Sequence, residues 1–131
     1  LNDVTIRSVG IVTSKAGMVR GNKYHLRERK YIYVMSGKME WAYRKHGEHE
    51  IKHEIFQTGD FFFTPPREEH AMLFLEDTSI FQLTTESRAA DGYEEDTVRT
   101  EEQLIALPSS EGSGALADKP SQSTSRHQAK A

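Results

Sequence analysis

Hydrophobic and polar residues alternate in short runs along the first 85 positions, and turn-forming residues separate these runs. Alternation with a period of two is typical of strands that bury one face, whereas a helix repeats about every 3.6 residues. Helical periodicity is almost absent before residue 86. The pattern therefore predicts about eight short strands and an all-β sandwich or barrel.

Two stretches of the first half carry much of this prediction. Residues 4–13, VTIRSVGIVT, are rich in β-branched side chains and indicate one long strand, or two short strands around Gly10. The run from Tyr31 to Met35 is strongly β-prone, and Ser36-Gly37 turns the chain. Residues 38–44 are predicted to return beside this run as the second strand of a hairpin.

The stretch from Gly59 to Phe74, GDFFFTPPREEHAMLF, contains the clearest turn and the clearest pair of strands. Its Pro65-Pro66 corner separates two apolar runs. Proline fixes φ and lacks a backbone donor, so the second strand starts at a defined place. His70 opens that second strand, and we expect it to lie where a barrel would hold a ligand.

The composition of the chain changes after residue 100. Residues 101–108 predict one helical turn or an edge segment that ends at Pro108. Residues 109–131 are mostly small and polar, with Leu116 as the one large apolar residue, and such a segment cannot bury enough surface to offset its ordering entropy. We predict a barrel domain over residues 1–100, a short segment over 101–108 and a disordered tail over 109–131.

Composition and charge exclude several classes of function. A chain of 131 residues without cysteine has no disulfide, thiolate metal site or cysteine nucleophile. No apolar run approaches the roughly 18 residues of a membrane span and no signal segment begins the chain, so a cytoplasmic location without a membrane partner is expected. The net charge of the chain is −3. Residues 86–102 carry 2 basic and 7 acidic residues, a net of −5, and are interpreted as a solvated edge or short helix. No basic face for nucleic acid stands out.

Two motifs of this chain resemble the two signatures of the cupin superfamily. The run Gly59-x5-Pro65-x-Arg67-x2-His70 is similar to the second signature, G-x5-P-x-G-x2-H-x3-N, with Arg67 in place of the glycine and Phe74 in place of the asparagine. The resemblance implies an all-β fold with a single cupin-type jelly-roll barrel. It also implies that His70 is a site residue.

The run from Gly21 to Gly37 resembles the first signature, G-x5-H-x-H-x3-4-E-x6-G. With Gly37 as the final glycine, Lys30 stands at the glutamate, His25 at the second histidine and Lys23 at the first. More narrowly, the phrases RGNKYH and YIYVMSGKMEWAYR resemble cupins of bacterial surface-polysaccharide and nucleotide-sugar pathways. These include the C-terminal cupin domain of capsular-polysaccharide epimerase-reductases and the small sugar-nucleotide ketoisomerases.

The ligand set departs from that of a metal-binding cupin. Where the family presents three histidines and a glutamate, this chain keeps His25 and His70 and has lysines at the other two places. Two ligands beside two ammonium groups make a poor cation site, so we expect no cofactor, with a weakly bound divalent metal on His25 and His70 as the alternative. Such a basic group would attract phosphate or carboxylate, and the predicted ligand-binding residues are Lys23, Lys30 and Tyr24.

Three functions follow from these residues and the resemblance. The first is a metal-independent epimerase or ketoisomerase for a sugar nucleotide or similar anion, in which His25 or His70 is the catalytic residue and moves a proton next to a carbonyl. The second is a non-catalytic module that binds a carbohydrate or small anion. The third is a metal-dependent cupin enzyme with a reduced ligand set. Whether the protein is an enzyme stays open, and by analogy with small cupins a homodimer that pairs or exchanges amino-terminal strands is expected.

Several other residues have both a functional and a plainer interpretation. His49 and His53 lie on one face of a predicted strand over residues 49–56 and form either a metal chelate or a half-buried strand edge. Glu68 and Glu69 are expected in a surface loop. A set of aromatic residues either lines a sugar-binding face or serves cross-strand packing or a dimer interface: Tyr24, Tyr31, Tyr33, Trp41 and Tyr43.

Overall fold

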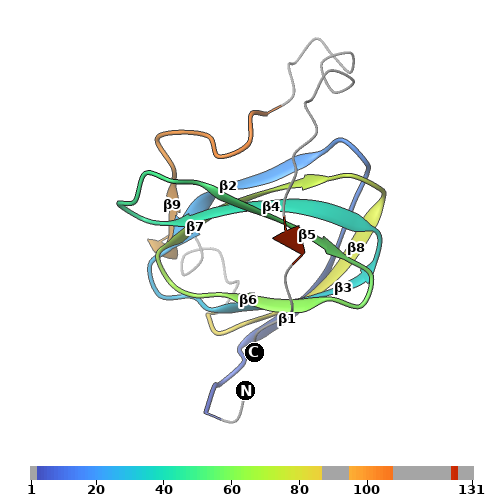
Figure 1. The fold of residues 1–131 in the computed structure, drawn as a ribbon. Coiled ribbons are helices and arrows are strands. Elements are labelled where there is room, and N and C mark those ends of the chain that lie inside the picture. Colours follow the sequence, from blue (N-terminus) through green and yellow to red (C-terminus); the bar gives the residue numbers. More distant parts are fainter. Residues whose placement is uncertain (1–2, 87–94, 108–124, 127–131) are drawn as a thin grey trace.

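The computed structural model describes residues 3–86, 95–107 and 125–126, which form two facing β-sheets (Figure 1). The strands are β1 (Ser8–Ser14), β2 (Val19–His25), β3 (Lys30–Ser36), β4 (Lys38–Lys45), β5 (Lys52–Gln57), β6 (Phe61–Thr64), β7 (Glu68–Phe74), β8 (Thr78–Thr84), β9 (Thr97–Arg99) and β10 (Ser125–Arg126). The predicted all-β class is confirmed, and eight strands lie before residue 86.

The strands divide into a smaller and a larger sheet. The first has four strands in the order β1-β8-β3-β6, and the second has six in the order β10-β5-β4-β7-β2-β9. The described pairings are antiparallel, apart from the parallel pairing of β5 with β10. The chain crosses repeatedly between the two layers, which is the jelly-roll arrangement.

The space between the sheets holds the main hydrophobic core. Alternate residues of each strand point inward, so the apolar positions of the sequence pattern meet there. Trp41 lies edge-on to Phe62 at 4.9 Å between ring centroids, and Phe56 stacks on Phe62 at 3.8 Å. The buried members of this core are Ile32, Val34, Met39, Trp41, Phe56, Phe62, Met72, Phe74 and Ile80.

A second apolar cluster lies on the outer face of the larger sheet. Residues 101–107 cross this face without forming a helix or strand, and Leu104 and Ile105 pack there against buried residues that include Leu73. Asn22 anchors the segment: its Nδ2 donates to the Ile105 carbonyl at 3.0 Å, and its Oδ1 accepts from the Leu104 N–H at 2.7 Å. One asparagine thus satisfies backbone groups that regular structure would otherwise pair.

The predicted hairpin over residues 31–44 is wrong in its pairing. Both strands exist, but β3 pairs with β6 and β8 whereas β4 pairs with β5 and β7. Gly37, with φ of 104°, takes the chain from one sheet to the other. Ile32 and Val34 before the turn and Met39 and Trp41 after it all join the same core, so burial, not local pairing, decides the geometry.

The proline corner connects β6 to β7, which also lie in different sheets. Arg67 stands at the glycine of the signature and has φ of 64°, a conformation that costs a residue with a side chain about 1–2 kcal/mol. Its N–H donates to the His25 carbonyl at 2.7 Å, which ties the corner to the end of β2. The expected surface loop at Glu68 and Glu69 is wrong, because both belong to β7.

The predicted tail over residues 109–131 lies outside the described residues, except that Ser125 and Arg126 pair with Glu54 and Ile55 of β5. Its disorder stays a prediction. Within the described part of the chain, no helix has the length and apolar character needed to cross a membrane.

Candidate functional site

A cavity of about 720 Å³ opens between the two sheets on the side where β2 and β9 face β1 and β8. Its walls come from both sheets and from the segment anchored by Asn22. The lining residues are Val12, Val19, Arg20, Gly21, Asn22, Lys23, Lys30, Met72, Ile80, Gln82, Arg99, Thr100, Gln103 and Leu107. This volume lies within the usual range for sites that bind small molecules and cofactors.

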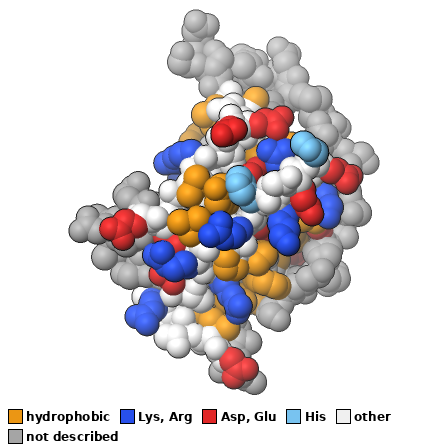
Figure 2. All heavy atoms as spheres, turned by 90° about the vertical axis from the view of Figure 1, so that its left-hand side faces the viewer, with side chains coloured by type: hydrophobic (Ala, Val, Ile, Leu, Met, Phe, Trp, Pro, Cys, Tyr) orange, Lys and Arg blue, Asp and Glu red, His pale blue; other side chains and the backbone are white. Residues whose placement is uncertain are grey.

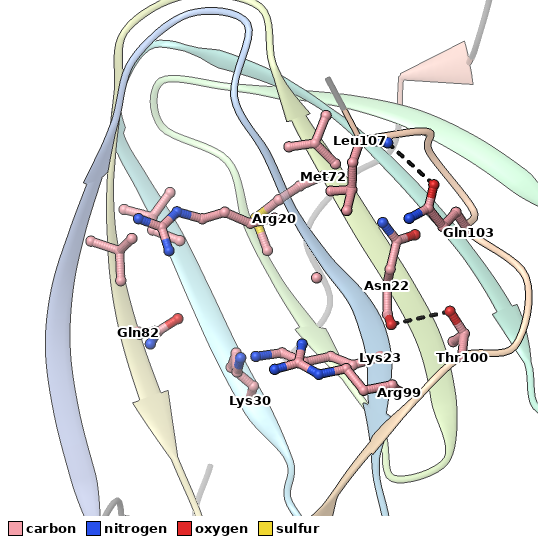
Figure 3. A pocket seen from close by; sticks show the side chains of 14 residues that line it. Arg20, Asn22, Lys23, Lys30, Met72, Gln82, Arg99, Thr100, Gln103 and Leu107 are labelled. Carbon is pink, nitrogen blue, oxygen red and sulfur yellow. Dashed lines mark hydrogen bonds between the residues drawn. The ribbon is translucent and has the colours of Figure 1, made fainter. Parts of the chain in front are cut away.

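The polar lining of this cavity is basic. Arg20, Lys23, Lys30 and Arg99 contribute four cationic side chains, and no acidic residue is among the described lining. Figure 3 shows the ends of Lys23, Lys30 and Arg99 close together on one side of the cavity, with Arg20 and Gln82 on another. Four positive charges around a concave, partly apolar surface favour an anionic ligand.

A bulge in β2 brings these cations together. The pairing of β2 with β7 shifts between Gly21 and Lys23, and Asn22 between them has φ of 58°. Because an extra residue turns the following side chain to the other face, Lys23 points into the cavity while Asn22 reaches the outer segment. Lys23 lies opposite Arg99 of β9, so β9 adds its cation beside that of β2.

Behind the lysines lies a buried group of ionisable residues around His25. The Nε2 atom of His25 is 3.3 Å from the Glu28 carboxylate, and its Nδ1 atom is 3.8 Å from the Asp96 carboxylate. Lys30 Nζ lies 3.9 Å from Glu28. All four side chains are almost fully buried, so their interactions are much stronger than those of exposed ion pairs.

Asp96 is held in place by the turn that follows His25. Its carboxylate accepts the N–H groups of Arg27 at 2.8 Å and Glu28 at 3.2 Å, and its carbonyl accepts the Leu26 N–H at 2.9 Å. The turn after β2 therefore fixes both carboxylates that flank His25. The Nδ1 atom of His25 also lies 3.2 Å from the Thr97 hydroxyl. A buried histidine flanked by two carboxylates is suited to hold or move a proton.

His70 has a different environment from His25. Its ring stacks on Trp41, its Nδ1 lies 3.2 Å from the Glu68 carbonyl, and its buried Nε2 has no hydrogen-bond partner in the described structure. Burial, together with the positive charge of Lys30, lowers the pKa of His70 to about 3. His70 is therefore a neutral imidazole at pH 7, at 6.0 Å from the His25 ring.

No protein-family profile and no curated protein sequence matches the chain. Solved structures do match. The capsular polysaccharide assembling protein CapF from Staphylococcus aureus has a TM-score of 0.67 and 21% identity over 76% of this chain. The match covers 27% of CapF, so this chain spans less than a third of that protein.

Two further structures share the fold. A double mutant of the QdtA 3,4-ketoisomerase from Thermoanaerobacterium thermosaccharolyticum, in complex with TDP, has a TM-score of 0.58 and 21% identity over 76% of this chain and 70% of that one. The Drosophila melanogaster CENP-C cupin domain has a TM-score of 0.51 and 13% identity over 58% of this chain and 55% of that one. The chain has the cupin fold. At these identities the likeness establishes the architecture of the barrel.

The cupin barrel brings four of the predicted site residues together. Lys23 and Lys30 line the cavity, and His25 and His70 lie behind them without lining it. Tyr24 is elsewhere: it points to the outer face of the larger sheet and stacks on His46 at 4.5 Å. The alternation of side chains along β2 requires this, because Tyr24 follows Lys23 directly.

Four residues of the site were not predicted from the sequence: Arg20, Glu28, Asp96 and Arg99. Glu28 sits three positions after His25, a spacing that could have indicated it. Asp96 belongs to the acidic stretch interpreted as solvated, yet it is buried under the turn after β2. Arg20 enters the cavity because it lies opposite Met72 of β7, and Arg99 because it lies opposite Lys23 of β2. Neither pairing leaves a local sequence signal.

The described residues contain no group of three or more histidine, aspartate or glutamate side chains arranged to hold a metal ion. The predicted pair of His49 and His53 is not a chelate. His49 precedes β5 and its carbonyl accepts from Arg44 at 3.2 Å, while His53 Nδ1 lies 2.8 Å from Glu40 on the neighbouring strand. The donor set around His25 and His70 includes Lys30 and does not fit a divalent cation well.

The predicted aromatic set does not form one sugar-binding face. Trp41 and Tyr43 point into the barrel, Tyr31 and Tyr33 lie on the outer face of the smaller sheet, and Tyr24 lies on the outer face of the larger one.

Figure 2 shows the side of the molecule that carries β9, where basic side chains surround exposed hydrophobic ones and acidic side chains lie toward the margins.

Proposed function

We propose that this cupin binds a sugar nucleotide, or a similar phosphorylated sugar, in the cavity between its sheets. The observation that carries the proposal is the set of four cations, Arg20, Lys23, Lys30 and Arg99, around a cavity whose described lining has no carboxylate. Arginine binds phosphate through two parallel hydrogen bonds and lysine acts as a point charge, so the pair of Lys23 and Arg99 suits a diphosphate.

The rest of the lining suits the uncharged parts of such a ligand. Val12, Met72 and Ile80 offer apolar surface, while Gln82 and Gln103 offer amide groups to hydroxyls. A fold neighbour, QdtA, was solved with TDP and is a 3,4-ketoisomerase, and CapF is a capsular polysaccharide assembling protein. These names support the ligand class that the cavity chemistry favours.

Calorimetric titration tests this proposal. The protein should bind nucleoside diphosphate sugars, and the matching unphosphorylated sugars should bind far more weakly. Lys23→Ala with Arg99→Ala should weaken binding by about 100-fold or more, because hydrogen bonds to charged groups contribute about 1.5–3 kcal/mol each. Lys15→Ala with Arg7→Ala, which removes the same charge outside the cavity, should have little effect. Equal losses in both double variants would contradict a cavity site.

Proton transfer is a second candidate function, favoured by the position of His25 between Glu28 and Asp96. In a keto sugar the carbon next to the carbonyl loses its proton to a base. Reprotonation at a neighbouring carbon then gives an isomer, and reprotonation of the same carbon from the opposite face gives an epimer. Because His25 does not line the cavity, it would exchange this proton through Lys30 and Glu28, which lie between it and the ligand. His70 would stay neutral beside it. A non-catalytic binding module would share the cavity but not this reaction.

Deuterium incorporation separates these two functions. In heavy water, a catalytic cupin should exchange the proton next to the carbonyl of a bound keto sugar nucleotide, and His25→Asn should abolish the exchange while leaving binding within a few-fold. Absence of exchange for every keto sugar nucleotide that binds would leave binding as the function. Metal analysis of the purified protein tests the metal-dependent alternative, which near-stoichiometric iron, manganese, nickel or zinc would favour.

A further inference from the structure

Lys30 is the most deeply buried of the four cations around the cavity. It opens β3 two positions before Ile32, whose side chain belongs to the core, so Lys30 points into the barrel from the smaller sheet. Its side chain is 6% exposed and still lines the cavity. The amine is therefore shielded from bulk water and open to a ligand in the cavity.

A single carboxylate oxygen connects this amine to His25. Lys30 Nζ lies 3.9 Å from Glu28 Oε2, and the same oxygen lies 3.3 Å from His25 Nε2. The side chains of Glu28 and His25 are 1% and 3% exposed, so bulk water has no access to this row of groups. A small rotation of the Lys30 side chain brings Nζ within hydrogen-bond distance of the oxygen. A proton can then pass from the amine through Glu28 to the imidazole and back.

Two further cations lie close to the amine. Figure 3 shows the ends of Lys23 and Arg99 beside that of Lys30. A lysine amine becomes a nucleophile when it is desolvated or lies next to another cationic group, and Lys30 meets both conditions. The Glu28 carboxylate stabilises the ammonium form, but His25 shares that carboxylate. These surroundings suit an amine that gives up its proton and takes it back.

A carbonyl group in the cavity can reach Lys30, whereas His25 and His70 do not line the cavity. We propose that Lys30 forms an imine with the carbonyl carbon of a phosphorylated keto sugar, and that Glu28 and His25 carry the protons of this step. The inference rests on the ligand class proposed above, because phosphates bound by Lys23 and Arg99 direct the sugar towards Lys30.

The step balances without an oxidant, a reductant or a metal. Glu28 takes one proton from the Lys30 ammonium and passes it to His25. The neutral nitrogen attacks the carbonyl carbon, a C–N bond forms, and a second proton moves from the nitrogen to the carbonyl oxygen. The first proton then returns through Glu28 to the new hydroxyl, which leaves as water. The product is a protonated imine with the same charge as the original ammonium, so the charge balance with Glu28 is kept.

This imine would assist proton exchange in a keto sugar. The positively charged nitrogen accepts the electron pair that remains when the neighbouring carbon loses its proton, so this carbon becomes more acidic than in the free ketone. Glu28, beside the imine nitrogen, is in position to take the proton and pass it to His25. Water then hydrolyses the imine and restores the Lys30 amine.

Reductive trapping tests the imine. The wild-type protein is incubated with dihydroxyacetone phosphate, which carries one ketone and one phosphate, and with sodium cyanoborohydride, whose hydride converts an imine into a permanent C–N bond. Intact mass and peptide mapping should show one label per chain, on Lys30. Glycerol 3-phosphate, the matched compound without a ketone, should give no label and should slow labelling when present in excess.

Three variants separate an imine from a simple buried ion pair. Lys30→Arg keeps the positive charge but removes the amine, so the label should disappear. Glu28→Gln should slow labelling by at least about 10-fold, because the proton path is interrupted. Lys15→Arg is the control: Lys15 is 86% exposed outside the cavity, and its replacement should leave labelling unchanged. The mapped position of the label in the wild-type chain decides the question even where a variant does not fold.

Calorimetry with a nucleoside diphosphate sugar distinguishes failure of the imine from failure of the proposed ligand class. Binding without a label on Lys30 would overturn the imine and leave the proposed function standing. Absence of both binding and label would overturn both. A label spread evenly over Lys15 and Lys30, or one that persists in Lys30→Arg, would also overturn the imine. A label confined to Lys30 would support it.

Discussion

The imidazole of His70 stacks on the indole of Trp41, with ring centroids 5.1 Å apart and ring planes 6° from parallel. This contact holds His70 against the hydrophobic core of the barrel, close to Lys23 and Lys30, which line the cavity. The core and the candidate site are therefore in direct contact. A neutral His70 is the form that this packing stabilises, because a charged ring would lie against an apolar surface and two ammonium groups.

Acid should destabilise the protein partly through His70. Its pKa is about 3 in the folded protein and near 6.5 in the unfolded chain, so between these values only the unfolded chain takes up the proton. Stability should therefore fall as the pH drops from about 6.5 towards 3. Denaturant unfolding at pH 7 and pH 4.5 should show a smaller pH dependence in His70→Gln than in wild type. An NMR titration of His70 with a midpoint near 6.5 would contradict this account.

Glu68 should make the protein less stable as the pH rises, which is the opposite of the effect of His70. Burial raises its pKa from 4.5 to about 7, so the folded protein holds a proton that the unfolded chain releases between these values. This contribution is present below about pH 4.5 and is lost as the pH rises through 7. Glu68→Gln should therefore raise the melting temperature more at pH 8 than at pH 5. Glu48→Gln, at an exposed turn, is the control, and an equal gain at both pH values for Glu68→Gln would refute the prediction.

Gly37→Ala should destabilise the barrel strongly. A Cβ atom there would lie 2.5 Å from the Asp77 carbonyl oxygen and 2.7 Å from the Thr78 Cα, in a backbone with φ of 104°. Backbone strain and the clash together should cost about 3 kcal/mol or more. Gly47 has a similar φ of 98°, but a Cβ atom there would have no neighbouring atom within 4 Å. Thermal unfolding of Gly47→Ala therefore measures the backbone strain alone. Equal melting temperatures would show that the chain shifts freely at Gly37.

Asn22→Ala should weaken ligand binding, although Asn22 is not one of the residues proposed to bind the phosphates. Its side chain holds Leu104 and Ile105, and the same segment supplies Thr100, Gln103 and Leu107 to the cavity wall. Loss of these hydrogen bonds should speed amide exchange at Leu104 and Ile105 and lower affinity several-fold. Hydrogen exchange measures the first effect and titration the second. Unchanged exchange at both amides would contradict the anchoring role.

The fold could be predicted from the sequence further than the site could. Alternation and turn spacing predicted the eight strands before residue 86, because those signals are local. The pairing of β3 and β4 was predicted wrongly, since Gly37 allows either a hairpin or a crossing between sheets and only the burial of Ile32 and Met39 together decides.

The site depends on contacts that no short stretch of sequence encodes. Lys23, His25, Lys30 and His70 were found through the cupin signatures, and the structure brings them together. The residues that surround these four were not predicted from the sequence. Asp96 lies 71 positions from His25 along the chain and reaches it only because β9 pairs with β2. Tyr24 was placed in the pocket although strand alternation turns it away from Lys23.

A crystal structure of the protein with a nucleoside diphosphate sugar tests the central claim most directly. The account predicts phosphate oxygens within hydrogen-bond distance of Lys23 Nζ and the Arg99 guanidinium, with the sugar directed towards Lys30 and the group around His25. Density for the ligand outside the cavity, or phosphates that contact neither Lys23 nor Arg99, would contradict it.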